Sequence, residues 1–353
     1  MNLENKKAFK KYDKGQVLES IKLLSKQCRQ AQREADKITL PAAYKQVKNI
    51  VICGMGGSSL ASHLIGQLFA ERLSVPFEII NDYQLPKYVD HDSLVFGISY
   101  SGQTEETIEA IKQAQTMKAR ILVITTGGQL AVLAKKFFWP SYVYKPVFNP
   151  SAQPRLGLGY SLISQIQILR NLNLLNISET ELEKALKFLE TSGDEFKETK
   201  KNNLAKRTAY KFLSKIPVIF SGNYFLGNAH IISNQINENA KNFACYFALP
   251  ELNHHLLEGL RHPSLHSDFV FFLLKSRLDR PVIKKRFSVT EKILNKMKLP
   301  VFSINIKGEN YLSQGLWLLV FGGFLSFYLA MLNKEDPSLI PWVNFFKKKL
   351  AVN

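Results

Sequence analysis

The feature that most constrains the fold is a short apolar run that enters a glycine-rich turn and continues into a helical segment. Residues 49–53 (NIVIC) are apolar enough for a buried strand, residues 54–59 (GMGGSS) form the turn, and residues 60–71 have helical character. A strand that ends in a glycine turn before a helix is typical of open parallel α/β sheets. The chain is therefore predicted to contain such a sheet.

The same plan recurs along the chain, because helical segments of ten or more residues separate short apolar runs. The strands predicted after the first one span residues 77–80, 93–98, 121–124, 216–220, 243–248, 269–274 and 300–306. Strands that alternate with helices in this way indicate a parallel sheet with helices on both faces. The expected fold class is α/β, with two tandem doubly wound parallel-sheet domains of flavodoxin-like type.

A stretch rich in Glu and Lys separates the two sets of strands and contains a break at Ser192-Gly193-Asp194. We expect a helical lead-in, a first α/β domain, connecting helices, and a second α/β domain with C-terminal helices. These parts span residues 1–47, 48–177, 178–211 and 212–353. Within the lead-in, apolar residues at helical spacing predict one amphipathic helix over residues 16–37.

Composition narrows the class of protein. Apolar residues make up 46% of the 353 residues and charged residues 22%, which is usual for a globular chain. The three cysteines (Cys28, Cys53 and Cys245) are scattered, which argues against a disulfide framework or structural zinc and suits a reducing cytoplasm. The first fifteen residues are charged throughout and lack the apolar region of a secretory signal.

Two further features raise the question of a membrane or a nucleic acid. Residues 315–332 carry no charge and approach the length of a membrane span, but two adjacent glycines favour a buried core helix. The formal net charge is +18, yet the basic residues are dispersed and no DNA-binding motif accompanies them. We therefore expect a soluble chain with a solvated basic surface, and neither a nucleic acid nor a membrane as partner.

Two polar loops are candidates for a phosphate site. The glycine turn lies where open sheets bind ligands, and its free N–H groups and the helix that follows favour an anion. A dinucleotide site would need a glycine at Ser59 and an acidic residue earlier than Asp82. A second loop, residues 99–107 (SYSGQTEET), follows the third strand, and Thr104 or a neighbour is predicted to cap the next helix. Ordinary turn and cap chemistry remains an alternative for either loop alone.

A possible acid/base pair lies in the second half. Glu238 stands between two amides in Asn237-Glu238-Asn239, and His254 follows sixteen residues later. A carboxylate can take a proton from carbon, and an imidazole can move one between oxygens. A surface charge and a surface histidine would give the same pattern.

In order along the chain, several motifs resemble the bifunctional phosphoglucose/phosphomannose isomerases, which contain tandem sugar isomerase (SIS) domains. The matching motifs are Gly54 to Ser58, Asp82-Tyr83 with Leu85-Pro86, Ser99 to Gly102 with Thr104 to Thr107, Pro154-Arg155 with Gly157 to Tyr160, Asn237 to Lys241, Pro250 to His254, and Asp336-Pro337 with Lys347. The resemblance covers nearly the whole chain, so it is more specific than any single motif.

The resemblance implies an aldose–ketose isomerase of carbohydrate metabolism that interconverts fructose 6-phosphate with glucose 6-phosphate and also mannose 6-phosphate, through a cis-enediol. By the same resemblance, the residues that bind phosphate are Gly56, Gly57, Ser58, Ser99, Ser101 and Thr104. Arg155 would stabilise the enediolate, Glu238 would carry the proton between C2 and C1, and His254 and Lys347 would open the sugar ring. His254 would act in a partner subunit of a homodimer, with no metal and no cofactor.

Alternatives stay open at three points. His255 and Leu256 depart from the family, in which Asn and Glu follow the catalytic histidine, so His255 could replace His254. Lys347 is chosen over Lys348 only by its spacing from Asp336-Pro337. For the whole chain, a non-catalytic sensor of sugar phosphates and another SIS-domain isomerase are the competing hypotheses.

Overall fold

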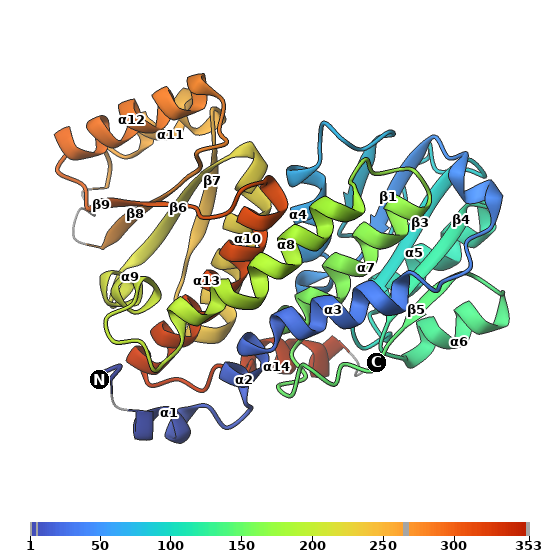
Figure 1. Ribbon diagram of the computed structural model, residues 1–353, viewed down its shortest axis with the longest axis horizontal. Helices are drawn as coiled ribbons and strands as arrows, with labels where there is room; N and C mark the ends of the chain where they lie inside the picture. The colour runs from blue at the N-terminus through green and yellow to red at the C-terminus, as the bar shows by residue number, and fades with distance from the viewer. Residues whose placement is uncertain (1, 5, 264–267, 351–353) are drawn as a thin grey trace.

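The computed structural model describes residues 2–4, 6–263 and 268–350. Within these ranges the chain forms two parallel β-sheets, each with helices on both faces, which confirms the α/β prediction (Figure 1). In the view of Figure 1 the first sheet lies on the right and the second on the left. A layer of helices lies between the two sheets.

In the first sheet every pairing is parallel, and the strand order is β2-β1-β3-β4-β5. The strands are β1 (Asn49–Cys53), β2 (Phe77–Ile80), β3 (Ser93–Ser99), β4 (Arg120–Thr125) and β5 (Ser141–Val143). The order reverses between β1 and β3, and at such a switch point the loops after the two strands diverge and leave room for a ligand. The edge strand β5 was not predicted, because three residues are too few to show a periodic pattern.

The second sheet repeats this arrangement with the order β7-β6-β8-β9, again parallel throughout. The strands are β6 (Ile216–Gly222), β7 (Cys245–Leu249), β8 (Phe269–Lys275) and β9 (Val301–Asn305). The second strand of each sheet pairs on one side of the first, and the third strand pairs on the other side. The predicted repeat of one plan in the two halves is therefore confirmed.

The α-helices complete both halves. The helices of the first half, in chain order, are α1 (Lys6–Tyr12), α2 (Val17–Lys22), α3 (Leu24–Ala35), α4 (Leu60–Leu68), α5 (Glu105–Thr116), α6 (Gly128–Lys136) and α7 (Leu158–Asn171). The later ones are α8 (Glu179–Ser192), α9 (Leu204–Phe212), α10 (Leu226–Ala240), α11 (Leu256–Gly259), α12 (Pro281–Lys296), α13 (Tyr311–Asn333) and α14 (Pro341–Leu350).

The single helix predicted over residues 16–37 is wrong. The chain leaves helical geometry at Leu23, where ψ is 4°, and this break separates α2 from α3. The physical reason is packing, because α2 lies against α13 whereas α3 lies against α7. One straight helix could not follow both partners.

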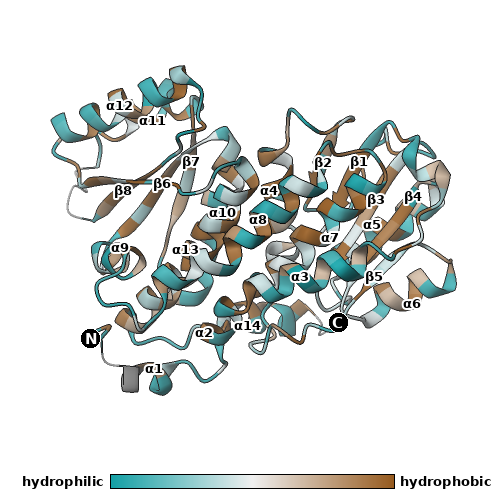
Figure 2. Ribbon diagram, in the orientation of Figure 1, coloured by the Kyte–Doolittle hydropathy of each residue, from teal (hydrophilic) through white to brown (hydrophobic). Residues whose placement is uncertain are grey.

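Strand residues alternate between two apolar layers, as expected for a sheet that is covered on both faces. In β1, Ile50 and Ile52 belong to the cluster that contains α4 and α7. Val51 and Cys53 face the separate cluster that contains Ile108 of α5. The first of these clusters extends into α10, α13 and the second sheet, so the two halves share one central core (Figure 2).

Helix α13 contains the uncharged segment noted in the sequence. By length and composition it could cross a membrane, but its apolar window is entirely buried in the structure. It packs against α8, α9 and α10, as expected for a helix that is apolar on all sides. At Gly322 a Cβ atom would lie 2.7 Å from Ile232 of α10, so glycine permits the close approach of the two helices. The prediction of a buried core helix is confirmed.

Candidate active site

Two loops lie at the carboxyl ends of β1 and β3, on either side of the switch point of the first sheet. We call residues 54–59 the first loop and residues 99–104 the second loop. The first loop contains a short 3₁₀ turn, Gly56–Ser58, before α4 begins. The backbone N–H of Tyr100 donates to the Ser58 hydroxyl at 3.0 Å, so a direct hydrogen bond joins the two loops.

The second loop is folded around its own hydroxyl groups. The hydroxyls of Ser99 and Thr104 lie 2.7 Å apart, and the Gly102 N–H donates to Ser99 at 3.1 Å. Ser99 is buried, Thr104 is half-buried and Ser101 is exposed. Thr104 occupies the residue before α5, but its hydroxyl makes no capping bond, so the predicted side-chain cap is wrong. The reason is that this hydroxyl is engaged by Ser99.

Glycine is required in both loops. Gly102 has φ of +67°, and a Cβ atom there would lie 1.8 Å from the carbonyl oxygen of Gly127. Gly56 also has a left-handed φ, +48°, but faces open space. Glycine reaches these conformations without the strain that a side chain would add. At Gly57 a Cβ atom would lie 2.9 Å from the backbone nitrogen of Arg155, so the first loop lies directly against the arginine segment.

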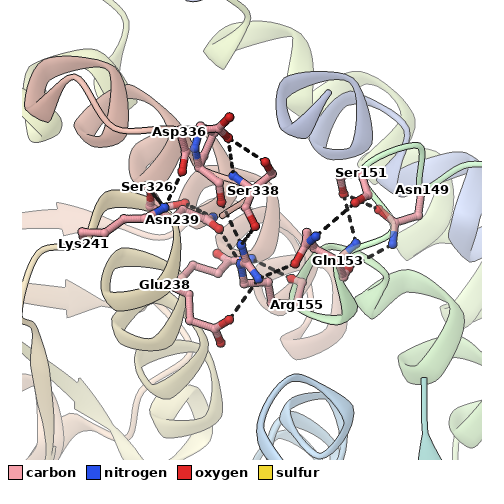
Figure 3. Close-up of polar contacts among 12 residues, drawn as sticks. Asn149, Ser151, Gln153, Arg155, Glu238, Asn239, Lys241, Ser326, Asp336 and Ser338 are labelled. Atoms are coloured by element: carbon pink, nitrogen blue, oxygen red, sulfur yellow. Dashed lines mark hydrogen bonds and ion pairs between the residues drawn. The ribbon is translucent and has the colours of Figure 1, made fainter. Parts of the chain in front are cut away.

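Arg155 is the centre of the polar network in Figure 3. It lies in the 3₁₀ turn Pro154–Leu156, and the residue is only 1% exposed. Nε donates to Asn239 Oδ1 at 2.6 Å, and Nη1 donates to Gln153 Oε1 and to Glu238 Oε2, both at 2.9 Å. Nη2 donates to the backbone carbonyls of Pro337 at 2.7 Å and Ser338 at 3.3 Å. A buried guanidinium needs this many acceptors, since desolvation without partners is costly.

Glu238 lies in the last turn of α10, and its side chain is 25% exposed. The carboxylate is therefore held by Arg155 on one side and still open to solvent on another. Burial lowers the pKa of Arg155, and the adjacent Glu238 carboxylate offsets part of this effect. The pair combines a fixed cation with a partly accessible carboxylate, as proton abstraction next to a developing negative charge requires.

Several partners of Arg155 were missed at the level of sequence. Asn239 was seen only as an amide that flanks Glu238, and Gln153 showed no signal beyond its place two residues before Arg155. The carbonyls of Pro337 and Ser338 could not be found, because a backbone acceptor carries no residue-type signature. Lys241, three residues after Glu238, donates to the carbonyl oxygens of Asn239 at 3.3 Å and of Asp336.

The structure does not bring His254 and Lys347 to this network. His254 ends the 3₁₀ turn Glu251–His254 and is exposed. Lys347 lies on α14, in which every described residue is exposed. Within the described part of the chain, neither side chain makes a hydrogen bond or ion pair. His255, the alternative to His254, pairs with Glu251 at 2.8 Å and is also exposed.

Two protein-family models match the chain. The model for the bacterial phospho-glucose isomerase C-terminal SIS domain matches residues 201–350, and the SIS domain model matches residues 43–136. A solved structure of a hypothetical protein from Thermus thermophilus has the same fold, with a TM-score of 0.72 at 17% identity. That similarity covers 96% of this chain and 91% of the other.

Two curated relatives carry the name bifunctional phosphoglucose/phosphomannose isomerase. The relative from Caldicellulosiruptor bescii is 30% identical, over 95% of this chain and 99% of its own length. The relative from Aquifex aeolicus is 33% identical, over 86% of this chain and 90% of its own length. Such identity over nearly complete chains, together with the two domain matches, establishes the relationship. The chain belongs to the bifunctional phosphoglucose/phosphomannose isomerase family, whose members are enzymes of the isomerase class.

Proposed function

We propose that the protein interconverts fructose 6-phosphate with glucose 6-phosphate and with mannose 6-phosphate, through a cis-enediol intermediate. The observation that carries this proposal is the Arg155–Glu238 pair directly beside the first loop. The names of the curated relatives describe the same two isomerase activities. A cytoplasmic location fits this role and the free thiols of the three cysteines.

The two loops would bind the 6-phosphate of the sugar. Gly56, Gly57, Ser58, Ser101 and Thr104 are at least partly exposed, whereas the buried Ser99 would act by holding the loop in shape. Backbone N–H groups and hydroxyls at the start of a helix suit a dianionic phosphate. Phosphate held there would direct the C1–C2 end of the sugar toward Arg155 and Glu238, because the first loop touches Arg155.

Glu238 would take the proton from C1 of the ketose, which breaks the C–H bond and leaves an enediol with negative charge on O2. The hydroxyl proton of O1 must then pass to O2, after which the same carboxyl group returns its proton to C2, C1 becomes the carbonyl carbon and the aldose is complete. The planar intermediate has no stereocentre at C2, so protonation on its two faces gives the glucose or the mannose configuration.

Arg155 would balance the charge during this step. In the structure its N–H groups are all engaged by acceptors of the described chain, one of which is the Glu238 carboxylate. When Glu238 takes the proton it loses its negative charge, while O2 of the sugar gains one. The Arg155 cation would then bind the enediolate oxygen in place of the neutral carboxyl group, so that no unpaired charge forms.

His254 and Lys347 would open the sugar ring, and we propose that a second copy of the chain completes the site. Their exposed positions, away from the Arg155 network, support a homodimer with a shared active site. Helix α14 supports it further, since Trp342 is 81% exposed and Phe346 is 61% exposed. An apolar helix face of this kind is typical of a protein interface.

The experiment that tests the function is incubation of the purified protein with fructose 6-phosphate in deuterated water, followed by NMR of the products. Formation of glucose and mannose 6-phosphates with deuterium at C2 is the expected result. Glucose 6-phosphate alone would limit the proposal to one epimer. Binding of fructose 6-phosphate without any turnover would overturn it in favour of a sensor.

A further inference from the structure

The segment between α13 and α14, residues 334–340, passes over the guanidinium of Arg155 (Figure 3). We call it the strap. The strap supplies backbone carbonyls rather than side chains, from Pro337 at 2.7 Å and Ser338 at 3.3 Å, both to Nη2. These two carbonyls therefore fix the direction of Nη2 and contribute to the plane of the guanidinium, together with the acceptors of Nε and Nη1.

Two devices hold the strap in place. Inside it, the Asp336 carboxylate accepts from the Ser338 N–H at 2.9 Å and from the Ser338 hydroxyl at 2.6 Å, which folds a tight turn. From outside, the Lys241 ammonium donates to the carbonyl of Asp336. Lys241 thus fixes the residue directly before the two carbonyls that bind Arg155.

Lys241 is well placed for this contact by the end of α10. Its φ of +50° is left-handed, as is common for the residue after a helix, and its ammonium also donates to the carbonyl of Asn239 at 3.3 Å. The residue as a whole is exposed, but the ammonium lies against two carbonyls and near the Arg155 cation. Desolvation, followed by repulsion from Arg155, lowers the pKa of Lys241 to about 8.

The same stretch of α10 contacts Arg155 directly. Asn239, whose backbone carbonyl binds Lys241, accepts from Arg155 Nε through its side chain and donates to Ser326 at 3.0 Å. Lys241 therefore joins two of the elements that surround the guanidinium, the end of α10 and the strap. Within the described part of the chain its ammonium forms no other hydrogen bond.

We propose that Lys241 is a positioning residue, which fixes the strap so that Arg155 is held against Glu238. The role in catalysis rests on the function proposed above. Without the ammonium, the hydrogen bonds of the described residues tie the strap to the end of α10 only at its start, where Asn333 donates to the carbonyl of Ala240 at 2.9 Å. The carbonyls of Pro337 and Ser338 can then shift, and Arg155 gains freedom to turn away from Glu238. Lys241 itself touches no reacting atom.

The test compares Lys241→Met with Lys298→Met. Lys298 is a matched control outside the strap, because it also follows a helix, has φ of +57° and is exposed, and its ammonium makes no hydrogen bond or ion pair to any described residue. With fructose 6-phosphate as substrate, Lys241→Met should lower kcat about tenfold and change KM less than about twofold. Lys241→Arg, which keeps a donor, should recover most of kcat. Lys298→Met should behave as the unmodified enzyme.

A second measurement does not depend on activity. The buried Nε–H of Arg155 should exchange slowly with solvent in ¹⁵N-arginine NMR spectra, with Arg155→Lys used to assign the signal. Lys241→Met should accelerate this exchange several-fold, with the melting temperature unchanged. Unchanged exchange and unchanged kcat in an active enzyme would overturn the positioning role. Faster exchange in a protein that never turns over sugar phosphates would support the positioning role and refute the proposed function instead.

Discussion

The guanidinium of Arg155 donates to the carboxylate of Glu238 at 2.9 Å, although the two residues are 83 positions apart. Arg155 precedes α7, which packs against α3 and α4 in the first half, and Glu238 lies in the last turn of α10, which packs on the second sheet. The candidate site therefore exists only when the two halves are packed together. Substitutions at this junction should therefore lower the catalytic rate more than they disturb the fold of either sheet.

Glu238→Gln should abolish isomerisation, because an amide cannot take the proton from C1. We expect kcat to fall by about 10³-fold or more, with the Kd for fructose 6-phosphate changed little. Steady-state kinetics and calorimetric titration measure the two quantities. Glu309→Gln removes an exposed carboxylate and should leave both unchanged. Wild-type turnover in Glu238→Gln would show that another group is the base.

Arg155→Ala should lower kcat more than it weakens substrate binding, since the cation matters most when O2 becomes negative. It should also cost about 3 kcal/mol in the free energy of unfolding, because the acceptors of a buried guanidinium lose their donor. Arg155→Lys should restore the charge but not the fork of hydrogen bonds. Equal losses in kcat and in substrate affinity would instead indicate that Arg155 only binds the phosphate of the substrate. Urea denaturation and kinetics provide the readouts.

Gly102→Ala should distort the second loop, because the new Cβ atom would lie 1.8 Å from the Gly127 carbonyl oxygen at a φ of +67°. The loop must move, so KM for fructose 6-phosphate should rise about tenfold or more if this loop binds the phosphate. Gly259→Ala, which adds a Cβ atom in open space, is the neutral control. A normal KM in Gly102→Ala would argue against the second loop as part of the phosphate site.

The contact between the two halves should weaken in acid. His230 of α10 lies 4.8 Å from His63 of α4 between ring centroids, and it stacks on Tyr246. Burial, with a smaller contribution from His63, lowers the pKa of His230 to about 4 from 6.5. Between these values the unfolded chain takes up a proton that the folded chain excludes. The free energy of unfolding should therefore fall as the pH is lowered from 6.5 to 4, by at most about 1.4 kcal/mol per pH unit.

His230→Phe keeps a ring against Tyr246 and cannot be protonated. Urea denaturation at several pH values should show a smaller pH dependence for this variant across the same window. An identical pH dependence would mean that His230 does not carry the effect. His63, whose pKa burial also lowers, would account for the remaining slope.

Helix α14 should hold two copies of the chain together. Trp342→Asp and Phe346→Asp place charge on its apolar face and should convert a dimer into a monomer, with loss of activity. Asn344→Asp, on the opposite face of the helix, should leave the dimer intact. Light scattering gives the mass, which should be about twice 40.2 kDa for the unmodified protein. A fully active monomer would exclude a shared site.

Local patterns along the chain were enough to predict the fold class, which the structure confirms, and to select the two loops that we propose as the phosphate site. Short-range signals suffice there, because a buried parallel strand and the glycine turn after it consist of adjacent residues, as in Asn49 to Ser59. The repeat of one strand–turn–helix plan in the two halves followed from the same local signals, whereas the strand order within each sheet came only from the structure. Resemblance to a family also selected Arg155 and Glu238, but it contained no distance between them.

How these residues meet depends on the packing of distant segments. The acceptors of Arg155 come from three separate stretches of the chain. Two of these acceptors are the backbone carbonyls of Pro337 and Ser338, and any residue type could supply such a carbonyl. The break at Leu23 and the engaged hydroxyl of Thr104 arise in the same way, from packing and from competition between hydrogen-bond partners. Such choices depend on which segments come together in space, and a pattern of neighbouring residues does not contain that information.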